Sequence, residues 1–200
     1  MFLWYWLRYL YLYILTLFKK KGQPEDIYLK PQKETAIAWP WLCDWNLHLN
    51  TSSQLSETEY SRALLLFSAK MSVRNSQFYW VMGSTMITFR RQIPMFAKYT
   101  KIIDFHCYDD KFFYYRQIFI YKGKVASVFI PKVVCVNKKT HKLVKPTEAL
   151  ELLDLSLNEK FQKVNQNIAQ WASSEQLLFK DLQKEFETTP IKKKQAKKIN

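Results

Sequence analysis

Positions 44–50 of the chain read Asp44-Trp45-Asn46-Leu47-His48-Leu49-Asn50. This stretch brings a carboxylate, an imidazole and two carboxamides into seven residues. The sequence Ser56-Glu57-Thr58-Glu59 then has the form of a capping box, in which Ser56 binds the Glu59 amide and Glu59 reaches back to Ser56. The pattern therefore predicts a helix that begins at Ser56, directly after the polar stretch.

An apolar stripe follows this helix signal. Tyr60, Ala63, Leu64 and Phe67 lie at spacings of i, i+3, i+4 and i+7, which is typical of one buried helix face. The polar stretch is thus expected at the N-terminal end of a core helix, where backbone N–H groups and the helix dipole favour negative charge. Such a position could stabilise an oxyanion, with a neighbouring carboxylate or imidazole activating water.

Length and charge limit the possible classes of protein. The 200 residues suit one domain with appendages, and the formal net charge is +14. Much of this charge comes from lysine blocks at 19–21, 192–194 and 197–198. Such blocks are solvated tails or meet anionic lipid or nucleic acid. Because no nucleic-acid-binding motif accompanies them, nucleic acid is not an expected partner.

The cysteine and histidine pattern indicates neither a disulfide framework nor a metal site. Cys43, Cys107 and Cys135 are widely spaced and form no CxxC pair, which favours a reducing compartment. Cys43 reads as a small buried hydrophobic residue, and His106 has no companion ligands. We therefore expect no metal and no cofactor.

The N-terminal segment is predicted to be a membrane anchor. Residues 1–18 are almost wholly apolar, with Arg8 as their one charge, and three lysines follow at 19–21. An anchor over 1–21 is favoured, and a helix lying in the membrane plane is the alternative because Arg8 falls in mid-span. Residues 22–33, with two prolines, read as a polar linker.

The central part of the chain, 34–145, reads as one α+β domain. Four alternating apolar runs follow the predicted helix, and short turn signals at 109–111 and 122–123 separate the last three. These three runs predict an antiparallel meander wrapped on the helix. The runs are Phe78–Ile93, Phe96–Tyr108, Phe112–Tyr121 and Lys124–Val136.

The C-terminal part changes to a helical pattern over 146–190, followed by a basic tail at 191–200. An apolar stripe over 157–186, which includes Phe161, Ile168 and Trp171, predicts a long amphipathic helix. This helix could pack on its own sheet or dock on another subunit. Residues 157–186 and the N-terminal helix are therefore the predicted contacts with protein partners.

Several separated motifs resemble the hotdog-fold thioesterases. The stretch Asp44-x-Asn46-x-His48-x-Asn50 before a helix is similar to the signature of plant acyl-carrier-protein thioesterases. The order of motifs most resembles membrane-anchored thioesterase-like proteins of the thioesterase superfamily member six type. The further counterparts are Glu57, Arg62, Arg90-Arg91, Pro94-Met95-Phe96, Asp109-Asp110 and the run from Phe112 to Val136.

This resemblance implies a hotdog fold, an antiparallel sheet wrapped on a central helix, that pairs as a homodimer or heterodimer. It implies catalytic roles for Asp44, which would activate water, and for Asn46 and His48, which would orient the water or the thioester. Asn50 and Thr51 would bind the substrate at the start of the helix. Arg90, on one face of a strand with Arg91 on the other, could hold a coenzyme A phosphate.

The helix start departs from the family pattern at two positions. Thr51 replaces the second asparagine of H-x-N-N, and Gln54 replaces an aromatic residue. Two functions therefore stay open: hydrolysis of acyl-CoA or acyl-carrier-protein thioesters at a membrane, or an inactive hotdog protein serving as an accessory subunit of a large membrane complex. Membrane lipids are the expected further partner, in the mitochondrial inner membrane or the endoplasmic reticulum.

Overall fold

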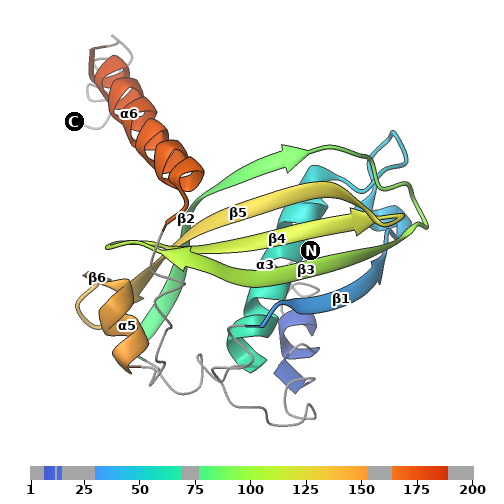
Figure 1. The fold of residues 1–200 in the computed structure, drawn as a ribbon, viewed down its shortest axis with the longest axis horizontal. Helices are drawn as coiled ribbons and strands as arrows, with labels where there is room; N and C mark the ends of the chain where they lie inside the picture. Colours follow the sequence, from blue (N-terminus) through green and yellow to red (C-terminus); the bar gives the residue numbers. More distant parts are fainter. Residues whose placement is uncertain (1–6, 12, 15–29, 69–76, 153–163, 189–200) are drawn as a thin grey trace, which may run out of the picture. The chain divides into compact units, whose positions relative to one another are not determined.

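The computed structural model describes residues 7–11, 13–14, 30–68, 77–152 and 164–188. The chain divides into two compact units, Met1–Lys163 and Val164–Asn200. In the first unit a curved antiparallel sheet packs against helix α3 (Figure 1). This α+β arrangement confirms the predicted fold class.

The sheet has the strand order β1-β3-β4-β5-β2, and the short β6 pairs with β5. All pairs are antiparallel. The strands are β1 (Gln32–Ile37), β2 (Phe78–Phe89), β3 (Lys98–Tyr108), β4 (Phe113–Tyr121), β5 (Lys124–Asn137) and β6 (Leu143–Val144). The predicted meander is confirmed as β3, β4 and β5, whereas β1 begins inside the stretch that was predicted to be a linker.

The turn between β3 and β4 shows why the meander could be predicted. Asp109 accepts hydrogen bonds at Oδ1 from the backbone N–H groups of Lys111 and Phe112, at 2.8 and 2.7 Å, and at Oδ2 from the Tyr114 hydroxyl at 2.7 Å. A short polar side chain that binds backbone two residues ahead is a common turn former. Asp109 is therefore a structural residue.

Helix α3 (Thr51–Ser68) begins five residues earlier than predicted. Asn50 is its N-cap, because Asn50 Oδ1 accepts the Ser52 amide at 2.9 Å and the Ser52 hydroxyl at 3.1 Å. The predicted capping box is wrong. Ser56 lies inside the helix, where its hydroxyl donates to the Ser52 carbonyl at 3.0 Å.

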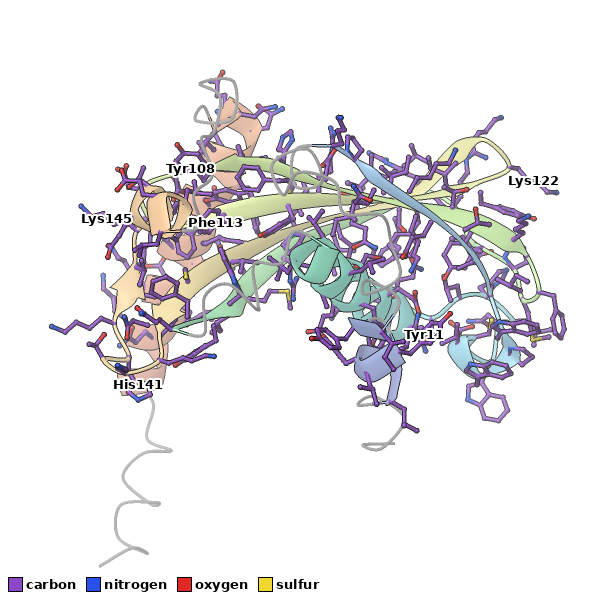
Figure 2. All side chains as sticks on the ribbon, turned by 90° about the horizontal axis from the view of Figure 1, so that it is seen from below. Tyr11, Tyr108, Phe113, Lys122, His141 and Lys145 are labelled. Carbon is purple, nitrogen blue, oxygen red and sulfur yellow. The ribbon has the colours of Figure 1, made fainter. Side chains whose placement is uncertain are left out.

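One face of α3 lies against the concave side of the sheet, as Figure 2 shows. Tyr60, Ala63, Leu64 and Leu65 are buried, which confirms the predicted apolar stripe for the members whose side chains are described. The same helix also buries four polar side chains. Hydrogen bonds to three different strands hold three of them, whereas Thr58 donates to the Gln54 carbonyl within the helix. These buried polar residues are Gln54, Glu57, Thr58 and Ser61.

The core has an aromatic cluster at each end of the sheet. At one end, Phe105, Tyr108 and Phe113 pack beside helix α5 (Pro146–Leu152), and Figure 2 labels Tyr108 and Phe113 there. At the other end, Tyr99 and Phe119 lie beneath the loops that contain residues 38–50 and 89–98. The second cluster supports the candidate site.

The C-terminal helix is shorter than predicted. Helix α6 (Gln166–Thr188) makes up the described part of the second unit, and Val164 and Asn165 before it are not helical. A single helix running through the whole predicted stripe is therefore wrong. Two residues of the predicted apolar stripe, Leu157 and Phe161, lie outside the described residues.

The described N-terminal residues, 7–11 and 13–14, are helical. Arg8 pairs with Glu57 of α3, and its guanidinium lies 4.0 Å from the centre of the Tyr60 ring. No helix among the described residues is long and apolar enough to span a membrane. Because most of 1–21 lies outside the described residues, the predicted anchor is not confirmed.

Candidate active site

Asp44 begins a tight turn that precedes α3. The Leu47 amide donates to the Asp44 carbonyl and the Asp44 amide donates to the His48 carbonyl, both at 3.0 Å. Within the turn, Asp44 Oδ1 accepts the Asn46 amide at 2.9 Å. The short polar side chain of Asp44 thus shapes the turn with one oxygen. No other hydrogen bond or ion pair of this carboxylate appears among the described residues, so Oδ2 can accept a hydrogen bond from a ligand.

His48 sits where the turn joins the rest of the domain. Its backbone forms an isolated bridge with Pro94, and the next residue, Leu49, donates to the Ile93 carbonyl at 2.8 Å. His48 Nδ1 is buried and has no hydrogen-bond partner in the described part of the chain. A buried polar atom without a partner is costly, so a molecule bound at this nitrogen would be stabilised.

The other predicted catalytic residue, Asn46, is exposed in the same turn. The structure therefore brings Asp44, Asn46 and His48 together in one turn of five residues. Cys43, which precedes this turn, donates from Sγ to the Ala38 carbonyl at 3.8 Å. Burial and the neighbouring Asp44 carboxylate raise the pKa of the Cys43 thiol, which disfavours a nucleophilic thiolate.

The two residues predicted to bind substrate at the helix start have different positions. Asn50 is committed to capping α3, so its amide side chain is structural. Thr51 is the exposed first residue of α3. The Gln54 amide donates to the Asn50 carbonyl, and no such acceptor receives the amides of Thr51 and Ser53 among the described residues. This helix start therefore offers free N–H donors beside the turn.

Arg90 lies at the same end of the domain, just after β2. The amides of Arg90 and Arg91 both donate to the Ala126 carbonyl, at 2.7 and 3.0 Å. The two arginines thus follow β2, which ends at Phe89, so the prediction that they lie within a strand is wrong. Both side chains are exposed.

A buried charged cluster lies beside α3, and it was not predicted from the sequence. Lys101 Nζ lies 2.7 Å from Glu57 and 2.9 Å from Glu34, and Arg8 also pairs with Glu57. Burial alone would raise the pKa of the Glu57 carboxyl, but Lys101 and Arg8 outweigh this effect and hold it below its usual value. Glu57 is therefore a buried carboxylate with two cationic partners.

The charged cluster forms part of the wall of a pocket of about 820 Å³ between β1, α3 and the N-terminal helical residues. Most of the remaining wall is apolar and includes Ile37, Trp41 and Leu42. Tyr99 is buried against the pocket, and its hydroxyl has no partner in the described part of the chain. Burial and the nearby Glu57 carboxylate raise the pKa of this phenol, so it stays protonated as a hydrogen-bond donor.

A sequence signal for this cluster exists. Glu57 is in helical phase with the buried Tyr60 and Leu64, and Lys101 alternates in phase with the buried Tyr99 and Ile103. Charged residues are rarely buried without a partner. Two opposite charges on two apolar faces therefore indicate a buried pair.

The described residues contain no group of three or more His, Cys, Asp or Glu side chains arranged to hold a metal ion. His106, on β3, lies beside Arg116 and Asp104. Burial, with Arg116 nearby, lowers the pKa of its imidazole.

Comparison with known proteins places this geometry in a family. The sequence profile of the thioesterase-like superfamily matches residues 37–198. A Saccharomyces cerevisiae protein named probable thioesterase YBR096W is 28% identical over 133 residues, which cover 65% of this chain. The chain spans only 57% of the length of this yeast relative.

Solved structures share the fold. The YbaW probable thioesterase from Escherichia coli superposes with a TM-score of 0.54 at 21% identity, over 66% of this chain and 98% of that protein. Slr0204, a 1,4-dihydroxy-2-naphthoyl-CoA thioesterase from Synechocystis, gives a TM-score of 0.52 at 10% identity, over 62% and 95% of the two chains. The predicted hotdog fold is confirmed, while a special closeness to membrane-anchored members stays a prediction.

Proposed function

Because the chain belongs to the thioesterase-like superfamily, we propose that it hydrolyses an acyl thioester of coenzyme A or of acyl carrier protein. One observation carries the proposal: the turn from Asp44 to His48 places a carboxylate and an imidazole directly before the free amides at the start of α3. A base for water and donors for an oxyanion are the two components that thioester hydrolysis needs.

The proposed reaction begins with water attacking the thioester carbonyl carbon while Asp44 takes a proton from the water. Negative charge then develops on the carbonyl oxygen, where the amides of Thr51 and Ser53 would stabilise it. Collapse of this intermediate breaks the C–S bond, and the protonated Asp44 returns its proton to the leaving sulfur. The products are a free thiol and a carboxylic acid, which loses its proton to solvent.

His48 is proposed to orient the water or the thioester. Its Nδ1 is buried and unpartnered, so a hydrogen bond from the bound reactants would satisfy it. The bridge to Pro94 fixes the backbone of His48 relative to the neighbouring loop. Asn46 and Thr51, both exposed beside this position, are proposed to contact the same substrate. Asn50 is left with a structural role.

The pocket beside α3 is proposed to receive the acyl group. Its volume of about 820 Å³ falls within the range of roughly 300–1,000 Å³ typical of small-molecule sites. Trp41 and Leu42 of its wall lie three and two residues before Asp44 in the chain. An apolar acyl chain would therefore enter close to the proposed base. Arg90, exposed at the same end, is proposed to pair with a phosphate of the carrier.

Hydrolysis of acyl-CoAs of graded chain length by the full-length protein tests this function. Asp44→Asn keeps the size of the side chain and an acceptor oxygen for the turn but removes the base. We expect kcat/KM to fall at least about 100-fold, the usual contribution of a general base. Asp110→Asn is the matched control, because Asp110 is an exposed aspartate in the turn between β3 and β4.

Unchanged turnover in Asp44→Asn would remove Asp44 from the mechanism. If the folded wild-type protein hydrolyses no acyl thioester, the second candidate function gains support: an inactive hotdog protein acting as an accessory subunit. The observation that favours this alternative is helix α6, on which Leu177, Leu178, Phe179 and Leu182 are exposed. A partner protein bound through 157–186 would cover part of this apolar surface.

Subunit pairing and membrane association belong to the same proposal. The strand β2 has twelve residues and, among the described strands, pairs only with β5, so its outer edge is free to pair with another subunit. Arg8 holds the N-terminal helical residues against α3, so membrane association is proposed through their exposed apolar side chains, such as Leu10 and Tyr11, with the mitochondrial inner membrane or the endoplasmic reticulum as the proposed location.

A further inference from the structure

Large apolar side chains stand exposed at the end of the domain that carries the Asp44 turn. Trp45 is fully exposed, and Leu47 and Phe96 are 57% and 61% exposed. Trp39 and Trp41, which stack with ring centroids 5.4 Å apart, are exposed beside them. We call these five residues the Trp45 face. Single exposed apolar residues are ordinary, but a group of this size marks an interaction surface.

Backbone hydrogen bonds hold the Trp45 face together. The Met95 amide donates to the Leu47 carbonyl at 2.7 Å, and the Phe96 amide donates to the Ala38 carbonyl at 2.7 Å. These bonds join residues 38–50 to residues 89–98, and the aromatic cluster around Tyr99 and Phe119 supports both from below. The five apolar side chains thus belong to one ordered surface.

Two members of this face have unfavourable backbone geometry. Leu47 and Phe96 have φ angles of 58° and 64°, in the left-handed region. Residues other than glycine, asparagine and aspartate are rare in this region, because the Cβ atom clashes with the backbone. Apolar side chains that are exposed and strained do not stabilise the fold, so their presence favours a role in binding.

The charges around the Trp45 face are almost all positive. The segments 38–50, 89–98 and 121–126 hold five basic residues, Arg90, Arg91, Lys98, Lys122 and Lys124, and one acidic residue, Asp44. All five basic side chains are exposed, and the ion pairs found among the described residues involve other cations. Figure 2 labels Lys122 at this end, away from His141 and Lys145 at the other.

We propose that the Trp45 face docks on the surface of an anionic lipid bilayer. Tryptophan favours the boundary between headgroups and acyl chains, and leucine and phenylalanine insert just below it. The five basic residues would then meet the anionic headgroups. An acidic protein partner is the alternative occupant that the experiment separates, because tryptophan is also common at protein–protein interfaces.

The docking surface and the pocket beside α3 share two residues, Trp39 and Trp41. A docked domain would therefore hold its pocket next to the membrane, and a long acyl chain could pass between the two without crossing water. This consequence rests on the proposed thioesterase function, whereas the docking itself does not.

An environment-sensitive label at position 45 tests the docking. The full-length protein, with Cys43→Ala to remove the accessible native thiol, carries a nitrobenzoxadiazole group on Trp45→Cys. The matched control carries the label on Lys139→Cys, in an exposed turn at the opposite end of the domain. Both proteins are mixed with phosphatidylcholine vesicles that contain or lack phosphatidylserine. Circular dichroism verifies the fold, which a fully exposed position should not disturb.

With anionic vesicles, we expect the label at position 45 to shift to the blue, to brighten and to be quenched by brominated lipid. The label at position 139 should stay in water, even if the N-terminal segment holds both proteins on the vesicles. Labels that respond alike, or a position 45 that stays in water, would overturn the proposal. A response to acidic acyl carrier protein but not to vesicles would also overturn it and assign the face to a protein partner.

Adding Asp44→Asn to the labelled protein separates the two proposals. This variant lacks the proposed base and one negative charge beside the face, so docking should be retained or strengthened while hydrolysis is lost. An active enzyme whose Trp45 face stays in water would leave the thioesterase function standing without the docking.

Discussion

The ammonium of Lys101 on β3 lies 2.7 Å from the carboxylate of Glu57 on α3. Both side chains are almost fully buried, at 5% and 2% exposure. The pair joins the middle of the central helix to the sheet beside the pocket. The two carboxylates of the cluster, Glu57 and Glu34, balance the charge of its two cations, Lys101 and Arg8. Removing one partner should therefore destabilise the domain more than removing both.

Lys101→Met leaves Glu57 with Arg8 as its remaining cationic partner. We expect the free energy of unfolding to fall by about 3 kcal/mol, the lower end of the cost of breaking a buried pair. The double variant Lys101→Met with Glu57→Leu should recover a large part of this loss, because no uncompensated charge stays buried. Urea denaturation of the wild-type protein, of Lys101→Met, of Glu57→Leu and of the double variant measures the coupling.

Lys98→Met is the control for this cycle, since Lys98 is an exposed lysine at the start of the same strand. Its effect should stay within about 0.5 kcal/mol, as for most surface substitutions. A double variant that is less stable than either single variant would show that the charges contribute more than their replacement by apolar packing.

The lowered pKa of Glu57 gives the stability a defined pH dependence. The carboxyl titrates near 4.5 when unfolded and below this value when folded, because burial is outweighed by Lys101 and Arg8. A group with a depressed folded pKa stabilises the protein above its unfolded pKa, and this contribution is lost as the pH falls through the folded pKa. Between neutral pH and about pH 4.5 its contribution should be constant, and it should then decrease.

Glu57→Gln should show a shallower loss of stability below pH 4.5 than the wild-type protein. Urea midpoints measured from neutral to acidic pH give both curves. Parallel curves would mean that the pKa of the Glu57 carboxyl is the same in the folded and unfolded states, contrary to the effect of its two cationic partners.

The N-cap of α3 can be located by a pair of substitutions. Asn50→Ala removes the oxygen that accepts the Ser52 amide, so we expect a loss of about 1 kcal/mol. Ser56→Ala should be neutral or slightly stabilising, because alanine is the better helix former inside a helix. Thermal unfolding of both variants distinguishes the structure from the predicted capping box, which would reverse the two effects.

The first residue of α3 could not be predicted from the local sequence pattern alone. Asn50 and Ser56 are both favourable N-cap residues, and both precede the apolar stripe. The choice depends on Gln54, which is buried and joined to Ser127 of β5 and to the Leu49 carbonyl. The hydrogen bond between Ser127 and Gln54 joins residues far apart in the chain, so it cannot be predicted from the sequence around either residue.

The meander could be predicted because its signals are local: apolar runs separated by two short turns, one built by Asp109. In contrast, β1 has the polar sequence QKETAI and forms a strand by pairing with β3, about 65 residues away in sequence. Likewise, the Asp44 turn was visible as a motif, whereas Glu57 and Lys101 become a site only when the fold unites them.

The strained Leu47 links stability to the proposed docking. Asparagine tolerates a φ of 58° far better than leucine, so Leu47→Asn should raise the free energy of unfolding by about 1 kcal/mol. The same change should weaken the blue shift of the label at position 45 on anionic vesicles, because one inserting side chain is lost. The control is Leu143→Asn, at an exposed leucine of β6 whose φ is not positive. It should not raise the free energy of unfolding and should not weaken the blue shift of the label at position 45. If Leu47→Asn and Leu143→Asn lower the stability equally, Leu47 is not strained, and an unchanged label would exclude Leu47 from the bilayer contact.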